Sequence, residues 1–519
     1  MSQTMPREDR VAVSVAGVKD STWSSERVAW CLIAVGALFR IVSILVSDNA
    51  GGDAGAHVGQ TAEWLSHPSV KFVFWTYPPG HFWLIGLFSL LVRDVVWAGR
   101  LLSLVCGIAS LYVVWKLVRL AFGVSAGLLS LAVFSFYSLH IGYSATSSAE
   151  VPYLFFLLVG TYCFLAGISA FEGQFRLLLS SGISFSVAES IRFEAWIFLF
   201  GLAAAAGGVW LWQRRLPNVA LTALAAWMVA AGAWPLFMMI YCRHTYGDAM
   251  YLVTQNHLRV VQALETTSMA HQLSVMPVAL LLSVSPIAVL AALAGLALSL
   301  SSSASSILAL ATLFFAGVEA FEIVHGGLLA TARYTITLGT LLCLASGCGF
   351  DWFIQRWLPV RAKLAHRLIF SLLFLNCIVL AAISFGSGRL ADEIASISPR
   401  LRYPQHISEV AQYLRGHMRT GDAVVFDDYN VESNILADSA GIPVPPGRRA
   451  YLASKINHVS LWDYLDHEHP RFLVYAERGT LRETLNLGPG CDGVQQVGQT
   501  EFRCTFASQV YRVYELSYR

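Results

Sequence analysis

The chain has 519 residues, of which 56% are hydrophobic, 12% are aromatic and only 13% are charged, and its mean hydropathy is +0.57. A soluble protein carries about a quarter charged residues, so much of the surface of this chain must face lipid instead of water. The formal net charge of +2 excludes a strongly basic nucleic-acid-binding protein, and nine scattered cysteines exclude a disulfide scaffold or a zinc ribbon. The class is a polytopic membrane protein.

Residues 1–27 mix both signs of charge with Ser and Thr and lack the apolar core of a signal peptide, so we expect a disordered cytoplasmic tail. Residues 28–388 then carry apolar runs near the length that a hydrocarbon core of about 30 Å requires of a helix. We predict an all-α bundle of about eleven transmembrane helices. The predicted spans are 29–47, 97–118, 124–142, 150–170, 176–190, 194–212, 218–242, 276–299, 306–324, 334–350 and 367–386.

The positions of Lys and Arg predict the orientation of the bundle, because positive residues beside spans stay in the cytoplasm. With a cytoplasmic N-terminus, one side holds clusters such as Arg214 with Arg215, while the opposite loops hold few cations. Our working expectation is a bacterial inner membrane, with the first loop (48–96) and residues 389–519 outside the cytoplasm. The first loop contains an amphipathic stretch over 57–65 and a short apolar segment over 82–92, and we expect the apolar segment at the interface because it is too short to span.

Residues 389–519 differ sharply in composition, with charges, Asp, Gly and Pro turns, and short alternating strands. This pattern predicts a small extracytoplasmic α/β domain. Its predicted elements are helices near 407–418 and 460–466 and strands over 423–428, 471–476 and 509–516. Cys491 and Cys504 are its only cysteines; an oxidising compartment would let them pair, and two free thiols are the alternative.

Ionisable residues at or inside a membrane are expensive and therefore mark candidate functional sites. In the first loop, Asp53 is a candidate general base, although Asp is also a favoured N-cap residue. Glu150 opens a span at the outer face, where a helix-start charge is the structural alternative. Arg192 and Glu194 lie between two apolar runs, where mutual neutralisation is the structural alternative to a functional role, whereas Arg333 begins a span and suits a phosphate. Residues 246–275, which include His257, are a candidate lid or a solvated connector.

Taken in order, these pieces resemble the GT-C superfamily of glycosyltransferases, and within it the branch that includes protein O-mannosyltransferases and lipid A aminoarabinose transferases. The resemblance covers nearly the whole chain and rests on the order, sidedness and spacing of short motifs. These are Asp53 in the first outer loop, Tyr77-Pro78-Pro79-Gly80, Gly99-Arg100, Ala149-Glu150-Val151-Pro152, Arg192-Phe193-Glu194, Arg333-Tyr334 and the outer C-terminal domain.

The resemblance implies transfer of a sugar from a polyprenyl-phosphate donor to a hydroxyl of a lipid, glycan or protein, at the outer face and with inversion. Asp53 would accept the proton of the acceptor, and Glu150 would orient the acceptor or a loop cation. The donor phosphate would be held by Arg333 with help from Lys71, His325 or Arg192. The expected substrate and lipid groove includes His57, Tyr77, Pro78, His81 and Tyr334.

One departure from the family pattern concerns metal binding. In this branch a second acidic residue often follows the loop Asp, and an aromatic residue stands a few positions later. Here Ala54 follows Asp53, and His57 stands at the later position. Asp53 and His57 with waters remain one candidate site for Mg²⁺ or Mn²⁺, and a cation-free site that uses Arg or Lys is the other.

A secondary transporter or a flippase for lipid-linked sugars is the alternative function. Transporters usually contain inverted repeats with broken helices near the midplane, and we find no such repeat in this sequence. The charged candidate residues also gather at one face of the membrane, as expected for an enzyme that works at a single membrane surface. We therefore prefer the enzyme.

Overall fold

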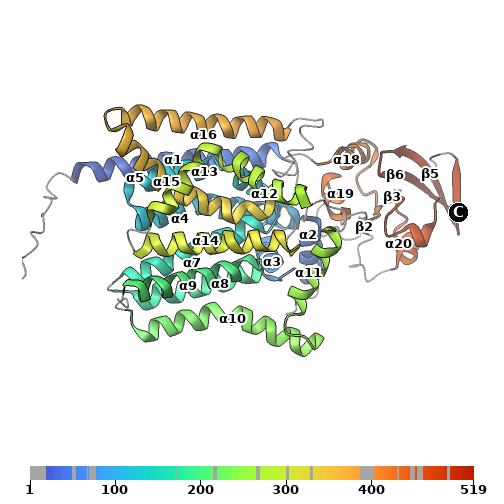
Figure 1. The fold of residues 1–519 in the computed structure, drawn as a ribbon. Coiled ribbons are helices and arrows are strands. Elements are labelled where there is room, and N and C mark those ends of the chain that lie inside the picture. Colours follow the sequence, from blue (N-terminus) through green and yellow to red (C-terminus); the bar gives the residue numbers. More distant parts are fainter. Residues whose placement is uncertain are drawn as a thin grey trace, which may run out of the picture.

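The computed structural model describes residues 19–48, 54–66, 68, 77–170, 172–213, 219–264, 269–299, 303–327, 331–385, 403–428, 432–442, 444, 450–452, 460–487, 491 and 493–519. A bundle of long helices is followed by a smaller domain that lies at one end of it (Figure 1). The bundle contains α1 (Lys19–Val46), α2 (Ala54–Ser66), α3 (Gly80–Val92), α4 (Val95–Phe122), α5 (Val124–Ser135), α6 (Ser138–Tyr143), α7 (Glu150–Ser169), α8 (Gln174–Ile191), α9 (Glu194–Gln213), α10 (Leu221–Tyr246), α11 (Tyr251–Leu264), α12 (Met269–Val284), α13 (Pro286–Leu298), α14 (Ser303–Val324), η2 (Ala332–Tyr334), α15 (Thr335–Trp357), η3 (Pro359–Arg361) and α16 (Ala362–Phe385).

Within the described residues, eight helices are long and apolar enough to cross a membrane, or nine if a bent pair is one span. This confirms the predicted class of a helical membrane bundle, but it does not confirm the predicted count of about eleven. The predicted span 124–142 forms the 12-residue helix α5 and then the short α6 after a break. The span 276–299 is bent by 100° between α12 and α13, where Ser285 has a positive φ of 90° before Pro286. The span 176–190 forms α8, which is rich in serine.

Glycines set the closest approaches within the bundle. A Cβ at Gly295 of α13 would overlap the carbonyl oxygen of Ala345, and one at Gly349 of α15 would overlap that of Ala291. Small residues at a helix crossing let two backbones approach closely, which favours packing inside a membrane. The pair α13 and α15 is therefore one of the tightly packed parts of the molecule.

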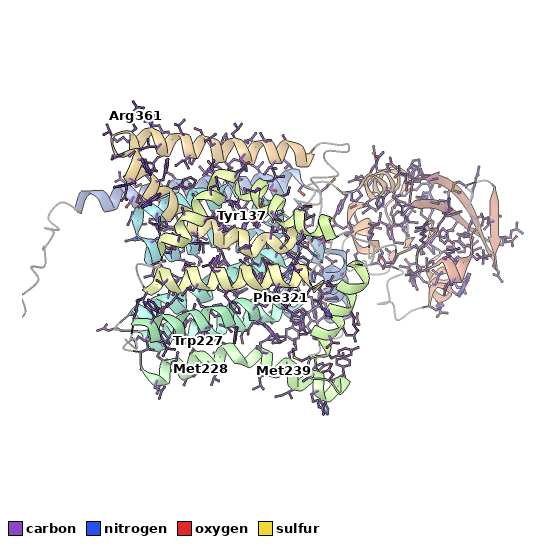
Figure 2. The ribbon with its side chains drawn as sticks, in the orientation of Figure 1. Tyr137, Trp227, Met228, Met239, Phe321 and Arg361 are labelled. Atoms are coloured by element: carbon purple, nitrogen blue, oxygen red, sulfur yellow. A yellow bond between two sulfur atoms is a disulfide. The ribbon has the colours of Figure 1, made fainter. Side chains whose placement is uncertain are left out.

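The helices at the edge of the bundle have one buried and one exposed face (Figure 2). On α10, Trp227 is buried and its indole N–H donates to the Ser181 hydroxyl of α8 at 3.1 Å. Its neighbour Met228 and, further along, Met239 are exposed. Exposed apolar side chains on a long helix suit contact with lipid.

The first outer loop forms two short helices that pack on each other. The amphipathic stretch 57–65 lies in α2, and the apolar segment 82–92 lies in α3, which is too short to span a membrane. The Thr61 hydroxyl donates to the Phe82 carbonyl at 3.3 Å, and it also donates to the His57 carbonyl at 2.8 Å. The contact with Phe82 ties α2 to α3, and the contact with His57 lies within α2.

The C-terminal domain is a mixed six-stranded sheet with helices packed on it. Its elements are α18 (Gln405–His417), β1 (Val424–Phe426), α19 (Ser433–Ser439), β2 (Ala450–Leu452), α20 (Leu461–Glu468), β3 (Phe472–Ala476), α21 (Arg482–Leu485), β4 (Val494–Val497), β5 (Thr500–Ala507) and β6 (Tyr511–Tyr518). The strand order is β2-β1-β3-β6-β5-β4, in which β2, β1 and β3 are parallel and the remaining pairs are antiparallel. Cys491 and Cys504 form a disulfide.

Several hydrogen bonds join the C-terminal domain to the bundle. The Asn434 amide of α19 donates to the Gly55 carbonyl in the first turn of α2 at 3.5 Å. The Val95 N–H at the start of α4 donates to the Val444 carbonyl at 2.9 Å, and the Val444 N–H donates to the Asp94 carboxylate at 3.3 Å. The domain therefore supports the first turns of α2 and α4 directly. The domain boundaries themselves stay predictions.

Candidate active site

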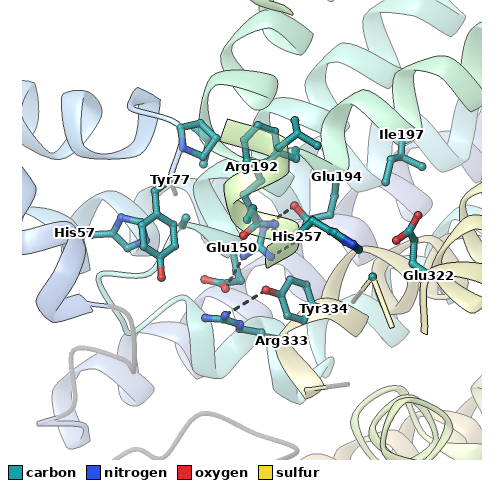
Figure 3. Close-up of a pocket in the computed structure, with 17 residues that line it drawn as sticks. His57, Tyr77, Glu150, Arg192, Glu194, Ile197, His257, Glu322, Arg333 and Tyr334 are labelled. Carbon is teal, nitrogen blue, oxygen red and sulfur yellow. Dashed lines mark hydrogen bonds and ion pairs between the residues drawn. The ribbon is translucent and has the colours of Figure 1, made fainter. Parts of the chain in front are cut away.

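A cavity of about 340 Å³ opens at the end of the bundle that carries the C-terminal domain (Figure 3). Its walls come from chain segments that are far apart in the sequence but end at the same level of the bundle. Its lining residues are His57, Tyr77, Pro78, Ala149, Glu150, Ile191, Arg192, Phe193, Glu194, Ile197, Val253, Asn256, His257, Glu322, Gly327, Arg333 and Tyr334. A concave site of this size with convergent polar groups is the usual form of a small-molecule site.

Arg192 is held between two carboxylates in the middle of the cavity wall. Its Nη1 lies 2.6 Å from Glu150 Oε1, and its Nη2 lies 2.5 Å from Glu194 Oε1. Its Nε also donates to both oxygens of Glu194 at 3.1 Å. The segment between α8 and α9 positions Arg192, and the first residues of α7 and α9 supply the carboxylates. The predicted mutual neutralisation of Arg192 and Glu194 therefore exists, and Glu150 takes part in it.

Arg333 and Tyr334 form a second polar group on the wall of the cavity. The Arg333 Nη2 donates to the Tyr334 hydroxyl at 3.2 Å, and its guanidinium carbon lies 5.0 Å from the centre of the Tyr334 ring. The Arg192 guanidinium carbon lies 5.4 Å from the same ring. Tyr334 thus stands between two guanidinium groups, which it attracts through the negative face of its ring.

His57, Tyr77 and His81 lie together at the α2 and α3 end of the cavity. The His57 ring centre is 5.0 Å from that of Tyr77 and 4.6 Å from that of His81. His81 is fully buried behind the lining, and burial, with the neighbouring His57 and Arg192, lowers its pKa well below the usual range. His81 is therefore a neutral group that packs against the lining residue His57.

The far end of the cavity is formed by α11 and the last turn of α14. In Figure 1, α11 runs across the end of the bundle, and its residues Val253, Asn256 and His257 reach the cavity. Glu322 of α14 points into the cavity from this side. The hypothesis that residues 246–275 form a lid or an acceptor contact is consistent with this position of α11.

The structure brings together seven of the residues that the sequence singled out as site candidates. They are Glu150, Arg192, Arg333, His57, Tyr77, Pro78 and Tyr334. His325 is different: it is exposed, it stacks on Phe321 with 4.0 Å between ring centres, and it is not part of the lining. Asp53 and Lys71 lie outside the described residues, although Asp53 directly precedes α2.

The sequence analysis missed two carboxylates on α14. Glu322 lines the cavity, and Glu319 is buried one turn earlier in the same helix. Both stand near the end of the apolar run 306–324, so the rule that a charge within a span marks a functional site would have selected them.

Metal binding depends on residues that the structure only partly covers. No group of three or more His, Cys, Asp or Glu side chains in the described part of the chain is arranged to hold a metal ion. His57 is in the cavity, but its proposed partner Asp53 is outside the described residues. We therefore derive no step that requires Mg²⁺ or Mn²⁺.

Comparisons with known proteins agree with this architecture. Residues 76–241 match the family model described as dolichyl-phosphate-mannose-protein mannosyltransferase. The structure of ArnT from Cupriavidus metallidurans bound to undecaprenyl phosphate is similar with a TM-score of 0.56 at 11% identity, over 93% of this chain and 97% of that chain. Its apo structure gives a TM-score of 0.53 at 10% identity, over 95% and 98%. The AglB oligosaccharyltransferase from Archaeoglobus fulgidus gives 0.48 at 12% identity, over 89% and 70%.

No curated protein matches the sequence. The family match over residues 76–241 and the similarity of fold over most of the chain confirm the predicted resemblance to the GT-C superfamily.

Proposed function

We propose that the protein is a membrane glycosyltransferase that moves a sugar from a polyprenyl-phosphate donor to an acceptor hydroxyl at the outer face of the membrane. The observation that carries the proposal is the cavity that gathers Glu150, Arg192 and Arg333 at one end of a GT-C fold. The family match and the undecaprenyl phosphate bound by the similar ArnT structure support a donor linked to a lipid phosphate.

The leaving group of such a donor is a phosphate, so its departure requires stabilisation of negative charge more than it requires a proton. We assign this role mainly to Arg333, because Arg192 already binds two carboxylates. An arginine can hold two phosphate oxygens at once through its planar guanidinium group. Lys71 remains a proposed helper, whereas the exposed position of His325 outside the lining makes it a weaker candidate.

We assign the role of general base to Asp53. It precedes Ala54, the first residue of α2, and His57 one turn later lines the cavity. A carboxylate there would accept the proton of the acceptor hydroxyl as the oxygen attacks the anomeric carbon, and displacement in one step inverts that carbon. Glu150, held by Arg192, would orient the acceptor.

The test is sugar transfer by the purified full-length protein from a panel of polyprenyl-phosphate sugars, with and without EDTA. We expect the wild type to transfer from at least one donor, and we expect Asp53→Asn to reduce the turnover by at least about 100-fold with an unchanged melting temperature. Glu172→Gln is the matched control, because Glu172 is an exposed residue outside the cavity lining. Transfer that survives in Asp53→Asn would exclude Asp53 as the base, and uptake into liposomes without any transfer would favour the transporter.

A further inference from the structure

We propose that Glu322 binds hydroxyl groups of the transferred sugar and so helps to select the donor; this inference rests on the proposed function. Glu322 lies in the last turn of α14 and faces the cavity (Figure 3). A carboxylate accepts hydrogen bonds only, and it accepts them more strongly than a neutral oxygen does. Sugar hydroxyls are donors that match this group.

The carboxylates of the cavity are not equivalent. Glu150 and Glu194 both bind Arg192, so their charge is largely compensated. The Glu322 carboxylate has no hydrogen bond or ion pair with any other residue that the structure describes. Because no described residue occupies the Glu322 carboxylate, both of its oxygens are available to accept hydrogen bonds from a ligand in the cavity.

The backbone next to Glu322 leaves room for its carboxylate. The Gly327 N–H donates to the Glu322 carbonyl at 2.7 Å, which folds the end of α14 back on itself. A Cβ at position 327 would overlap the Glu322 Oε2 atom. Gly327 also lines the cavity, and its φ is not positive. The lack of room for a side chain beside the Glu322 carboxylate, and not the backbone conformation, therefore accounts for glycine at this position.

The position of Glu322 favours the sugar over the other two ligands of the reaction. In Figure 3, Glu322 stands at the opposite side of the cavity from His57 and Tyr77, and Arg192 and Arg333 lie between them. The acceptor hydroxyl must reach the proposed base Asp53, which is the residue before Ala54 in the sequence, and His57 of the same helix α2 lines the opposite side of the cavity from Glu322. The donor phosphate would be repelled by a carboxylate and attracted by Arg333, so the sugar is the part of the donor that fits against Glu322.

Binding measurements on the full-length protein test this assignment. The probes are undecaprenyl phosphate and the undecaprenyl-phosphate sugar that the wild type transfers. We expect Glu322→Gln to weaken binding of the sugar-bearing lipid by roughly 10- to 100-fold, the cost of a hydrogen bond to a charged group. Binding of undecaprenyl phosphate itself should change less than about twofold, because the phosphate does not contact Glu322.

A second variant moves the carboxylate and keeps its charge. We expect Gly327→Ala to push the flexible end of Glu322 aside and to cause the same selective loss of binding. Donors that lack one sugar hydroxyl give a further check: one of them should bind less tightly to the wild type but equally well to Glu322→Gln.

The outcomes separate the two proposals. An equal loss for both lipids, no loss for either, or a change only in the KM for the acceptor would overturn the role of Glu322 in sugar binding and leave the proposed function intact. A wild type that transfers sugar from no donor of the panel would overturn both.

Discussion

Arg192 is the most highly connected charged residue of the cavity, and its partners predict what its loss will cost. It pairs with Glu150 and Glu194 in a mostly buried position, where its side chain is 13% exposed. Removal of one partner of a buried ion pair leaves an uncompensated charge, which typically costs about 3–5 kcal/mol. The cluster is therefore a structural element as well as a chemical one.

We expect Arg192→Met to lower the free energy of unfolding by about 3 kcal/mol, because Glu150 and Glu194 both lose the cation that contacts them directly. The triple variant Arg192→Met, Glu150→Gln, Glu194→Gln should recover most of this loss. The melting temperatures of the detergent-purified proteins give the comparison. Equal melting temperatures for the single and triple variants would mean that the carboxylates find other partners.

The residues of the cavity differ in how well the sequence predicted them. Glu150, Arg192 and Arg333 were accessible to prediction because each is a charge at the end of an apolar run. Glu322 carries the same signal inside the predicted span 306–324, but it belongs to none of the motifs of the family resemblance. His325 opens the segment 325–334 that ends with Arg333 and Tyr334, and it is a predicted helper of Arg333, whereas in the structure it is exposed and stacks on Phe321. His325 directly follows α14 and Arg333 lies in η2, so membership of one short sequence segment does not decide whether both side chains reach the cavity.

At the scale of the elements, close helix crossings have glycine at the point of contact. We expect Gly349→Ala to destabilise the protein by about 1–3 kcal/mol, because the new methyl group overlaps the backbone of α13. Gly208→Ala in α9 is the matched control, since no atom lies within 4 Å of its added Cβ. The control should be neutral or slightly stabilising, and thermal unfolding of both variants gives the test.

The stability of the protein should respond to pH through Asp438 of α19, which interacts electrostatically with Asp94 and Arg100 at the start of α4. Burial, with the neighbouring carboxylate of Asp94, raises the pKa of Asp438 from 3.8 to about 7, and Arg100 opposes this effect. Because the folded protein holds this proton more tightly than the unfolded chain does, the stabilisation is complete below about pH 4 and is lost as the pH rises through 7.

We therefore expect the melting temperature of the wild type to fall more between pH 5 and pH 8 than that of Asp438→Asn, which cannot ionise there. Melting curves of the two proteins across this interval measure the difference. Parallel curves would show that Asp438 stays charged in the folded protein.

Which elements the sequence could predict depends on their length and pattern. Long apolar runs such as those of α4 and α7 were predicted closely because hydropathy alone marks them. Hydropathy does not show where a run breaks, so α5 with α6 and the bend at Ser285 were each read as one span. In the C-terminal domain the prediction lacks α19, β2, α21, β4 and β5. All of these elements except β5 are seven residues or shorter and carry little periodicity, whereas β5 has eight residues and was also not predicted.

At the scale of the whole molecule, the cavity and the C-terminal domain share one end of the bundle (Figure 1). We expect this end to face the extracytoplasmic side, as the distribution of positive residues predicts. In intact cells, a membrane-impermeant thiol reagent should label Arg478→Cys in the C-terminal domain but not Arg361→Cys at the opposite end, and both positions are exposed. Labelling of Arg361→Cys but not of Arg478→Cys would show that the topology is the opposite of the predicted one and that the cavity faces the cytoplasm.

The hydrogen bond from Asn434 to Gly55 joins residues that are 379 positions apart, and this separation has a consequence for biosynthesis. At a translation rate of about 5–20 residues per second, the ribosome reaches Asn434 roughly 20–80 s after Gly55. During this interval the helices of the bundle can insert, while the first turn of α2 still lacks its support from α19. The helix that carries His57 therefore gains this support only after the bundle has been synthesised, and a nascent chain that stalls before α19 lacks it.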